Sequence, residues 1–150
     1  TTPVDTIDKG EYYIVEGDEY NTTYKNMYLT TSKKTFVYQG IGGLNMGAPR
    51  EANQGMFFVP PLNCGARGDV KNVPMIDKIG TTIYNGGLNI VAKTGEEVIL
   101  TYGAAGLYNL KDPPPTGLTK LGPNPVDGSS DYVTYQLTGL SGNVAVSSTN

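Results

Sequence analysis

Turn-forming residues interrupt this chain so often that no long helix is expected. Of its 150 residues, 20 are glycine and 10 are proline, which is one fifth of the chain. Glycine and proline are poor helix formers and good turn formers, so this composition favours many short strands joined by turns. A chain of this length can bury one core without disulfides, and we expect a single module over residues 1–150.

Runs of β-branched and aromatic residues predict where the strands lie. The predicted strands are residues 9–16, 26–31, 35–40, 56–59, 81–84, 87–92, 97–101, 131–137 and 144–146. The second and third of these runs predict a hairpin, and the three runs between residues 81 and 101 predict a meander. The expected fold is an all-β, antiparallel β-sandwich of jelly-roll or Ig-like type, with short strands and long Gly/Pro-rich loops.

The run Met56–Val59 is the most apolar of the predicted strands. It shows no alternation, which indicates a strand buried on both faces, and Pro60 and Pro61 end its pairing because proline has no backbone N–H. The glycine-rich residues 41–55 before it and the proline-rich residues 111–130 are predicted to be loops. Long loops often carry function, so we expect these two to contact a partner.

Charge and residue types exclude several classes of function. The net charge is about −3, with no basic run longer than Lys33–Lys34, so we expect no nucleic-acid partner. No apolar run reaches the 18 residues of a membrane span. Histidine is absent and Cys64 is the only cysteine, which removes Ser-His-Asp and Cys-His triads and tetrahedral thiolate metal sites.

An enzyme built from this chain would depend on carboxylate, tyrosine or lysine chemistry. The adjacent carboxylate pairs are Asp18–Glu19 and Glu96–Glu97. Neighbouring side chains on a strand point to opposite faces, so neither pair converges on one substrate. We therefore expect a protein that is not an enzyme, with a hydrolase as the least favoured option.

Two parts of the chain resemble each other in order. In residues 11–32 and again in residues 132–148, a tyrosine-rich strand leads through a polar turn into an apolar strand that ends in Ser or Thr. The first copy continues into Thr35–Tyr38, and the second does not. This pattern predicts a fragment of a larger surface protein with an incomplete second repeat at residues 131–150, or a strand supplied by a neighbouring copy.

Four quoted stretches together carry a family resemblance: "NMYLTTSKKTFVYQGIGG", "NQGMFFVPPLNC", "YNGGLNIVAKTGEEV" and "YVTYQLTGLSGNVAVSS". Over about residues 9 to 148 the chain resembles the IgGFc-binding-protein-like β region of large secreted Bacteroidetes proteins, which often precedes a gliding-motility or type IX secretion sorting domain. By this resemblance, residues 35–39 take the place of the strand before the variable loop. Asn53, Gln54 and Pro60–Pro61 match the family's Gln and Pro-Pro signature. The resemblance implies a secreted or cell-surface location and an adhesive role, with no catalytic residue.

The candidate binding residues come from the first long loop and from tyrosines. In and beside the loop they are Arg50, Asn53 and Gln54. Tyr102 and Tyr108 stand beside loops, where a ring can stack on a sugar while loop amides bind the sugar hydroxyls. Most of the 11 tyrosines have the simpler explanation that Tyr is a common strand residue.

One loop offers oxygen ligands for a metal. Asp127, Ser129 and Asp131 are close in sequence, and calcium takes hard oxygen ligands of this kind. The spacing is not that of an EF-hand, and an ordinary solvated turn is the alternative. No other cofactor is expected.

Two functions follow from these observations. The first is a non-enzymatic binding or adhesion module of a bacterial surface or filament protein, whose partner is a surface protein, a glycan or a neighbouring copy joined by strand addition. The alternative is a carbohydrate-binding module that recognises a polysaccharide through tyrosines and loop amides.

Overall fold

The computed structural model describes residues 5–15, 23–24, 26–41, 55–62, 69–103 and 106–148. These residues form eleven strands and no helix, and every strand pairing is antiparallel, so the all-β prediction is confirmed. They contain no helical segment with the length and apolar character that a membrane crossing requires. The chain packs as two compact units, Thr30–Arg67 and the remainder (Thr1–Leu29 with Gly68–Asn150). The single module expected over residues 1–150 stays a prediction.

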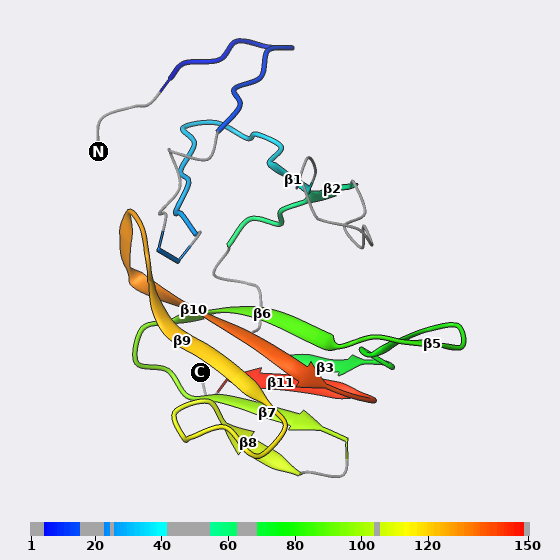
Figure 1. The fold of residues 1–150 in the computed structure, drawn as a ribbon. Coiled ribbons are helices and arrows are strands. Elements are labelled where there is room, and N and C mark those ends of the chain that lie inside the picture. The colour runs from blue at the N-terminus through cyan, green and yellow to red at the C-terminus, as the bar shows by residue number, and fades with distance from the viewer. Residues whose placement is uncertain are drawn as a thin grey trace. The chain divides into compact units, whose positions relative to one another are not determined.

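The larger unit is a sandwich of two antiparallel sheets (Figure 1). One sheet has the order β6-β10-β9 and the other β3-β11-β7-β8. The bounds of these strands are β3 Val70–Val73, β6 Gly86–Lys93, β7 Val98–Tyr102, β8 Leu107–Asn109, β9 Thr119–Val126, β10 Ser129–Leu140 and β11 Val144–Ser148. A small hairpin of β4 (Lys78–Ile79) and β5 (Thr82–Ile83) lies between β3 and β6 in the chain.

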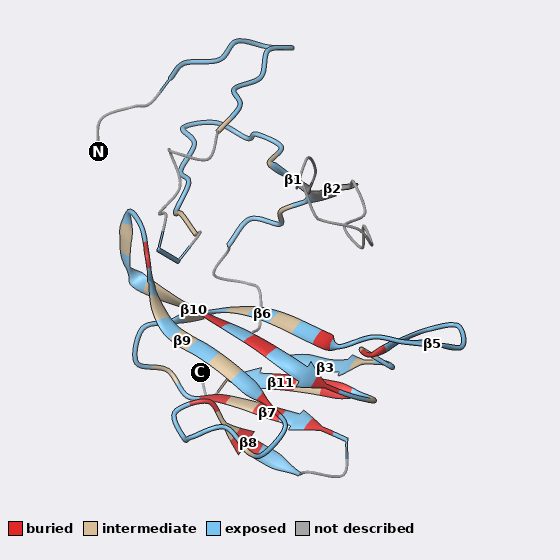
Figure 2. Ribbon diagram, in the orientation of Figure 1, coloured by how far each residue is buried: buried red, intermediate tan, exposed pale blue. Residues whose placement is uncertain are grey.

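The core lies between the two sheets, where alternate residues of each strand face inward. Along β7 and β11 the buried positions alternate with less buried ones, as a half-buried strand requires. Figure 2 shows buried residues gathered on β7, β10 and β11. The most deeply buried side chains are Leu100, Leu110, Leu137, Leu140 and Val144.

Polar side chains hold the proline-rich connection between β8 and β9. The ammonium of Lys120 donates to the backbone oxygens of Leu110 (2.6 Å) and Asp112 (2.7 Å). The Tyr108 hydroxyl donates to the same Asp112 oxygen at 3.0 Å. These bonds satisfy carbonyl groups that lie outside any strand, so a segment with three consecutive prolines still has a defined path.

The structure corrects two predictions, the meander between residues 81 and 101 and the loop at residues 111–130. β6 and β7 follow each other in the chain but lie in different sheets, because β6 pairs with β10 and β7 pairs with β11 and β8. Residues 119–126, predicted as part of a loop, form β9. Its prolines, Pro123 and Pro125, are tolerated because β9 is an edge strand and needs hydrogen bonds on one side only.

The predicted N-terminal strands are also corrected. Residues 11–15 and 26–31 belong to no strand in the structure. The hairpin predicted between residues 26–31 and 35–40 is replaced by a different one, in which β1 (Tyr38–Ile41) pairs with β2 (Gly55–Phe58). Strand-type residues alone do not choose a partner, and the choice depends on contacts distant in sequence.

The smaller unit contains this β1–β2 hairpin. The predicted strand at Met56–Val59 is confirmed in its position, since β2 covers Gly55–Phe58 and Pro60 follows outside it. Burial on both faces is wrong at Phe58, whose side chain is 46% exposed. The two-stranded sheet leaves that ring at the surface, where it packs edge-on against Phe36 and Tyr38, with ring centroids 6.3 and 5.9 Å away.

Candidate functional site

A β-bulge in the edge strand β9 forms a candidate site in the larger unit. Gln136 of β10 pairs with Leu121, and Thr134 of β10 pairs with Asn124. The interval contains one more residue on β9 than on β10, so the ladder is interrupted at Gly122 and Pro123. Bulges commonly re-aim side chains at sheet edges, and here the residue at the bulge has no side chain to fill the space.

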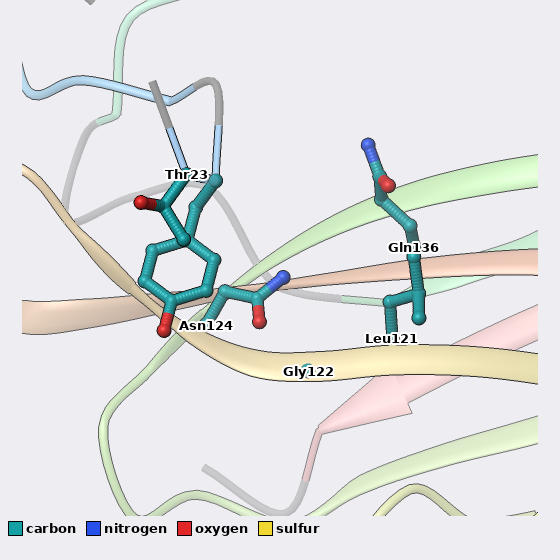
Figure 3. Close-up of a pocket in the computed structure, with 6 residues that line it drawn as sticks. Thr23, Leu121, Gly122, Asn124 and Gln136 are labelled. Atoms are coloured by element: carbon teal, nitrogen blue, oxygen red, sulfur yellow. The ribbon is translucent and has the colours of Figure 1, made fainter. Parts of the chain in front are cut away.

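The bulge opens a shallow depression of about 490 Å³, which we call the bulge groove. Its lining comes from β9, from β10 and from a segment far away in sequence. The lining residues are Thr23, Tyr24, Leu121, Gly122, Asn124 and Gln136. Figure 3 shows Thr23 and Asn124 on one side of Gly122, with Leu121 and Gln136 on the other.

Strand alternation decides which β10 side chain reaches the groove. Tyr135 and Leu137 are buried in the core, so Gln136 between them points out from the sheet. Leu121, its cross-strand partner, is 55% exposed on the same face. The groove therefore has an apolar side chain and an amide next to each other at one end.

The two amides of the groove are available to a ligand. Neither the Asn124 nor the Gln136 side chain forms a hydrogen bond with any part of the chain that the structure describes. Each amide offers one acceptor oxygen and two N–H donors. None of the six lining residues is charged. The arrangement suits a neutral polar ligand better than an ion.

A set of contacts brings the N-terminal segment to this face of the sheet. The Asn26 amide nitrogen donates to Thr134 Oγ1 (2.8 Å) and to the Pro125 carbonyl (3.2 Å). The Tyr28 N–H donates to the Asp127 carbonyl at 2.8 Å, and the Tyr28 ring stacks on Tyr132 with centroids 5.9 Å apart. These contacts hold the chain just after Thr23 and Tyr24.

The two tyrosines predicted to stack on sugars, Tyr102 and Tyr108, are buried in the structure. Tyr102 is 9% exposed and Tyr108 is 7% exposed, and both belong to the core between the sheets. Burial raises the pKa of the Tyr108 hydroxyl, and the nearby carboxylate of Asp112 raises it further. The aromatic residue among those that line the groove is Tyr24.

The other predicted site residues are only partly described. Arg50, Asn53 and Gln54 lie outside the described residues. Asp127 lies in the turn between β9 and β10, and Ser129 and Asp131 lie in the first residues of β10. The backbone N–H of Asp131 donates to Ser129 Oγ, and the Asp131 carbonyl accepts from the Thr94 N–H. The described residues contain no group of three or more Asp, Glu, His or Cys side chains suited to a metal. The calcium site stays a prediction.

Sequence reasoning missed the groove because its parts are separated by about a hundred residues. One local signal was present: Gly-Pro-Asn-Pro at residues 122–125 interrupts an otherwise extended run, as a bulge in an edge strand does. The outward position of Gln136 also follows from alternation along residues 131–137.

Comparisons of the chain with protein-family models, with curated proteins and with solved structures found no match. The family resemblance stated from the sequence therefore stays a prediction.

Proposed function

We propose that this chain is a non-enzymatic binding module of a secreted or cell-surface bacterial protein, and that the bulge groove holds its ligand. The observation that carries the proposal is the groove's lining, in which an aromatic ring, an apolar side chain and two amides without hydrogen-bond partners surround one uncharged depression. Ligand sites commonly combine apolar surface with a few placed polar groups in this way. The location outside the cell, in a surface or filament protein, is supported by the family resemblance.

The residues of the groove favour binding over hydrolysis. Glycoside hydrolysis uses two carboxyl groups on either side of the bond that breaks, and the six lining residues include no carboxylate. The adjacent carboxylates Glu96 and Glu97 lie just before β7. Glu96 accepts a hydrogen bond from Ser148 Oγ at 3.1 Å, so its carboxylate has a structural partner.

A carbohydrate-binding module is the second candidate, favoured by Tyr24 and the two amides. A tyrosine ring can stack on the C–H face of a sugar while Asn124 and Gln136 bond the hydroxyl groups. In this proposal the sugar stacks on Tyr24 in the groove, in place of Tyr102 and Tyr108, which were predicted from the sequence. Since the lining is uncharged, the expected ligand is a neutral polysaccharide rather than an acidic one.

The test is a binding screen against neutral and acidic polysaccharides and against candidate surface proteins, followed by groove variants. The double variant Asn124→Ala and Gln136→Ala removes two hydrogen-bonding groups worth about 1 kcal/mol each, so affinity should fall about tenfold or more. The control is Asn72→Ala, which changes an exposed amide on β3 in the other sheet.

The outcomes separate the two candidates. Binding to one neutral glycan that is lost in the groove variant supports the carbohydrate-binding module. Binding to a protein alone, lost in the same variant, supports an adhesion module. Unchanged binding in the groove variant would exclude the groove as the site, and release of product from any substrate would exclude a non-enzymatic role.

A further inference from the structure

The edge strand β6 offers an open row of backbone hydrogen-bonding groups. It lies at the end of the sheet order β6-β10-β9, and its other side has no strand partner among the described residues. Its ladder with β10 is regular from Lys93 to Gly87, with a register shift only at the end. It contains no proline, and a long regular edge of this kind is a template for pairing with another strand.

The other sheet edges are shorter or protected. β9 carries two prolines and the bulge, and the Asn26 side chain bonds the Pro125 carbonyl. β3 has four residues and β8 has three, against eight in β6. Natural sheets protect their edges with such devices, and β6 has only a terminal lysine.

The core is also incomplete along this edge. The inward side chains of β6, Leu88, Ile90 and Ala92, pack against the core but are only partly buried. Val70 of β3 pairs with the buried Val146 yet is 49% exposed. β6 and the segment after β3 are neighbours, because a side chain on Gly86 would meet Ile76. Apolar side chains at this edge therefore remain open to a further strand.

A segment suited to that position occurs in the same chain. Residues 11–15, Glu-Tyr-Tyr-Ile-Val, have the β-branched and aromatic character of a strand but belong to none in the structure. Tyr12 is 80% exposed and Ile14 is 60% exposed. A turn fixes the start of the segment, since the N–H of Glu11 donates to the Asp8 carbonyl at 3.0 Å.

We propose that residues 11–15 of one copy add to β6 of a second copy as an antiparallel strand. Alternation and charge set the register. With Glu11 opposite Lys93, Tyr12 and Ile14 fall opposite Ala92 and Ile90 and extend the inner face of the sheet. The added strand supplies backbone partners to β6 and covers its half-buried apolar side chains. Repeated addition links copies into a linear assembly. This assembly does not depend on the bulge groove or its ligand.

Sedimentation velocity of the full chain over a wide concentration range tests the proposal. Self-association is expected, and Ile14→Asp should weaken it roughly tenfold to a hundredfold, because the association loses the burial of one isoleucine side chain. Ile14 is exposed and outside every strand, so this variant should fold normally. Leu107→Asp, on the short edge strand β8, is the matched control and should leave association unchanged. A monomer at every concentration would overturn the proposal.

A disulfide between two different copies tests the register. In a Cys64→Ser background, Tyr13→Cys is introduced in one preparation and Val91→Cys in another, and the two are mixed under oxidising conditions. A mixed disulfide dimer in excess of either homodimer is expected, with Leu107→Cys replacing Val91→Cys as the control. If β6 amides are instead protected from hydrogen exchange in the dilute monomer and no mixed dimer forms, β6 is covered within its own chain and the proposal is wrong.

Discussion

Gly122 is the residue on which the bulge groove depends. Its φ is +108°, a conformation that side-chain-bearing residues rarely adopt. A Cβ atom at this position would also collide with the Thr134 carbonyl oxygen of the neighbouring strand. The missing side chain thus permits the backbone path of the bulge and the close approach of β9 to β10.

Gly122→Ala is expected to lower the free energy of unfolding by about 1–3 kcal/mol, since it combines backbone strain with a steric clash. The matched control is Gly117→Ala, because Gly117 also has positive φ (+91°) but nothing within 4 Å of its Cβ position. Urea denaturation should show a larger loss for Gly122→Ala. Equal losses would mean that the close approach to Thr134 does not matter.

Tyr108 links the core to the loop before β9. Its hydroxyl donates to the Asp112 carbonyl, and the pKa of that hydroxyl is raised by burial first and by the Asp112 carboxylate second. Burial likewise raises the pKa of Tyr135. Below about pH 10, the usual tyrosine pKa, both hydroxyls are neutral in the folded and the unfolded chain. Above it the unfolded chain loses protons first, so stability falls as pH rises through that window.

Tyr108→Phe is therefore expected to act in two ways. At neutral pH it should lower the free energy of unfolding by about 1 kcal/mol, the typical value of one hydrogen bond. Above about pH 10 the variant should lose stability less steeply than the parent, because one titrating group is gone and Tyr135 remains. Urea unfolding at several pH values measures both effects. Tyr84→Phe, at an exposed position, is the control and should leave the free energy of unfolding at neutral pH unchanged.

At the scale of elements, the segment around Asn26 is attached to the β9–β10 hairpin by side-chain bonds, by one backbone bond and by a ring stack, without a strand ladder. The Asn26 amide bonds Thr134 and the Pro125 carbonyl, and its oxygen accepts from the Asp127 N–H at 3.3 Å. The Asn26 side chain thus joins this segment to β9, to β10 and to the turn between them.

Asn26→Ala is expected to detach this segment while leaving the sandwich folded. Loss of these bonds should lower stability by about 1–2 kcal/mol and increase proteolytic cleavage between residues 23 and 30. Ligand affinity at the groove should fall too, because the segment that carries Thr23 and Tyr24 is held less firmly. Limited proteolysis and a urea titration measure the first two effects, with Asn72→Ala as control. Unchanged cleavage would contradict the anchoring role.

Strands were predicted correctly where an alternating run was bounded by turns. The prediction failed where the assignment depended on which strand pairs with which. The runs at residues 87–92, 97–101, 131–137 and 144–146 all became strands, since alternation places their apolar side chains on one face. The prolines of residues 119–126 concealed a strand, and residues 11–15 have strand-type side chains but belong to no strand. Edge position and pairing are properties of the sheet, which local sequence does not contain.

At the scale of the whole molecule, the two sheets of the larger unit are held together by the aliphatic and tyrosine side chains between them. β10 contributes Tyr135, Leu137 and Leu140 to this core, and β7 and β11 contribute the facing residues. Side chains on the outer faces, such as Leu121, contribute little to this cohesion. Substitutions on the inner face of this sheet should therefore change stability, and substitutions on its outer face should change ligand binding.

Leu137→Ala is expected to cost about 2–5 kcal/mol, because it leaves a cavity at a side chain that is 1% exposed. Leu121→Ala, on the outer face, should cost less than about 1 kcal/mol but weaken binding at the groove. Urea denaturation and the ligand titration compare the two. A large stability loss at Leu121 would show that the groove side of the sheet is part of the core.

The sequence by itself determined the class of this protein: many glycines and prolines rule out long helices, and alternation identifies most of the sandwich strands and their inward faces. It also excluded histidine-dependent triads and tetrahedral thiolate metal sites. Only the tertiary structure decided that β6 and β7 lie in different sheets, that Tyr102 and Tyr108 are buried, and that Tyr24 lines the same groove as Asn124 and Gln136. The reason is physical: composition and alternation act between neighbouring residues, whereas sheet order, edges and grooves arise from pairings between residues far apart in the chain.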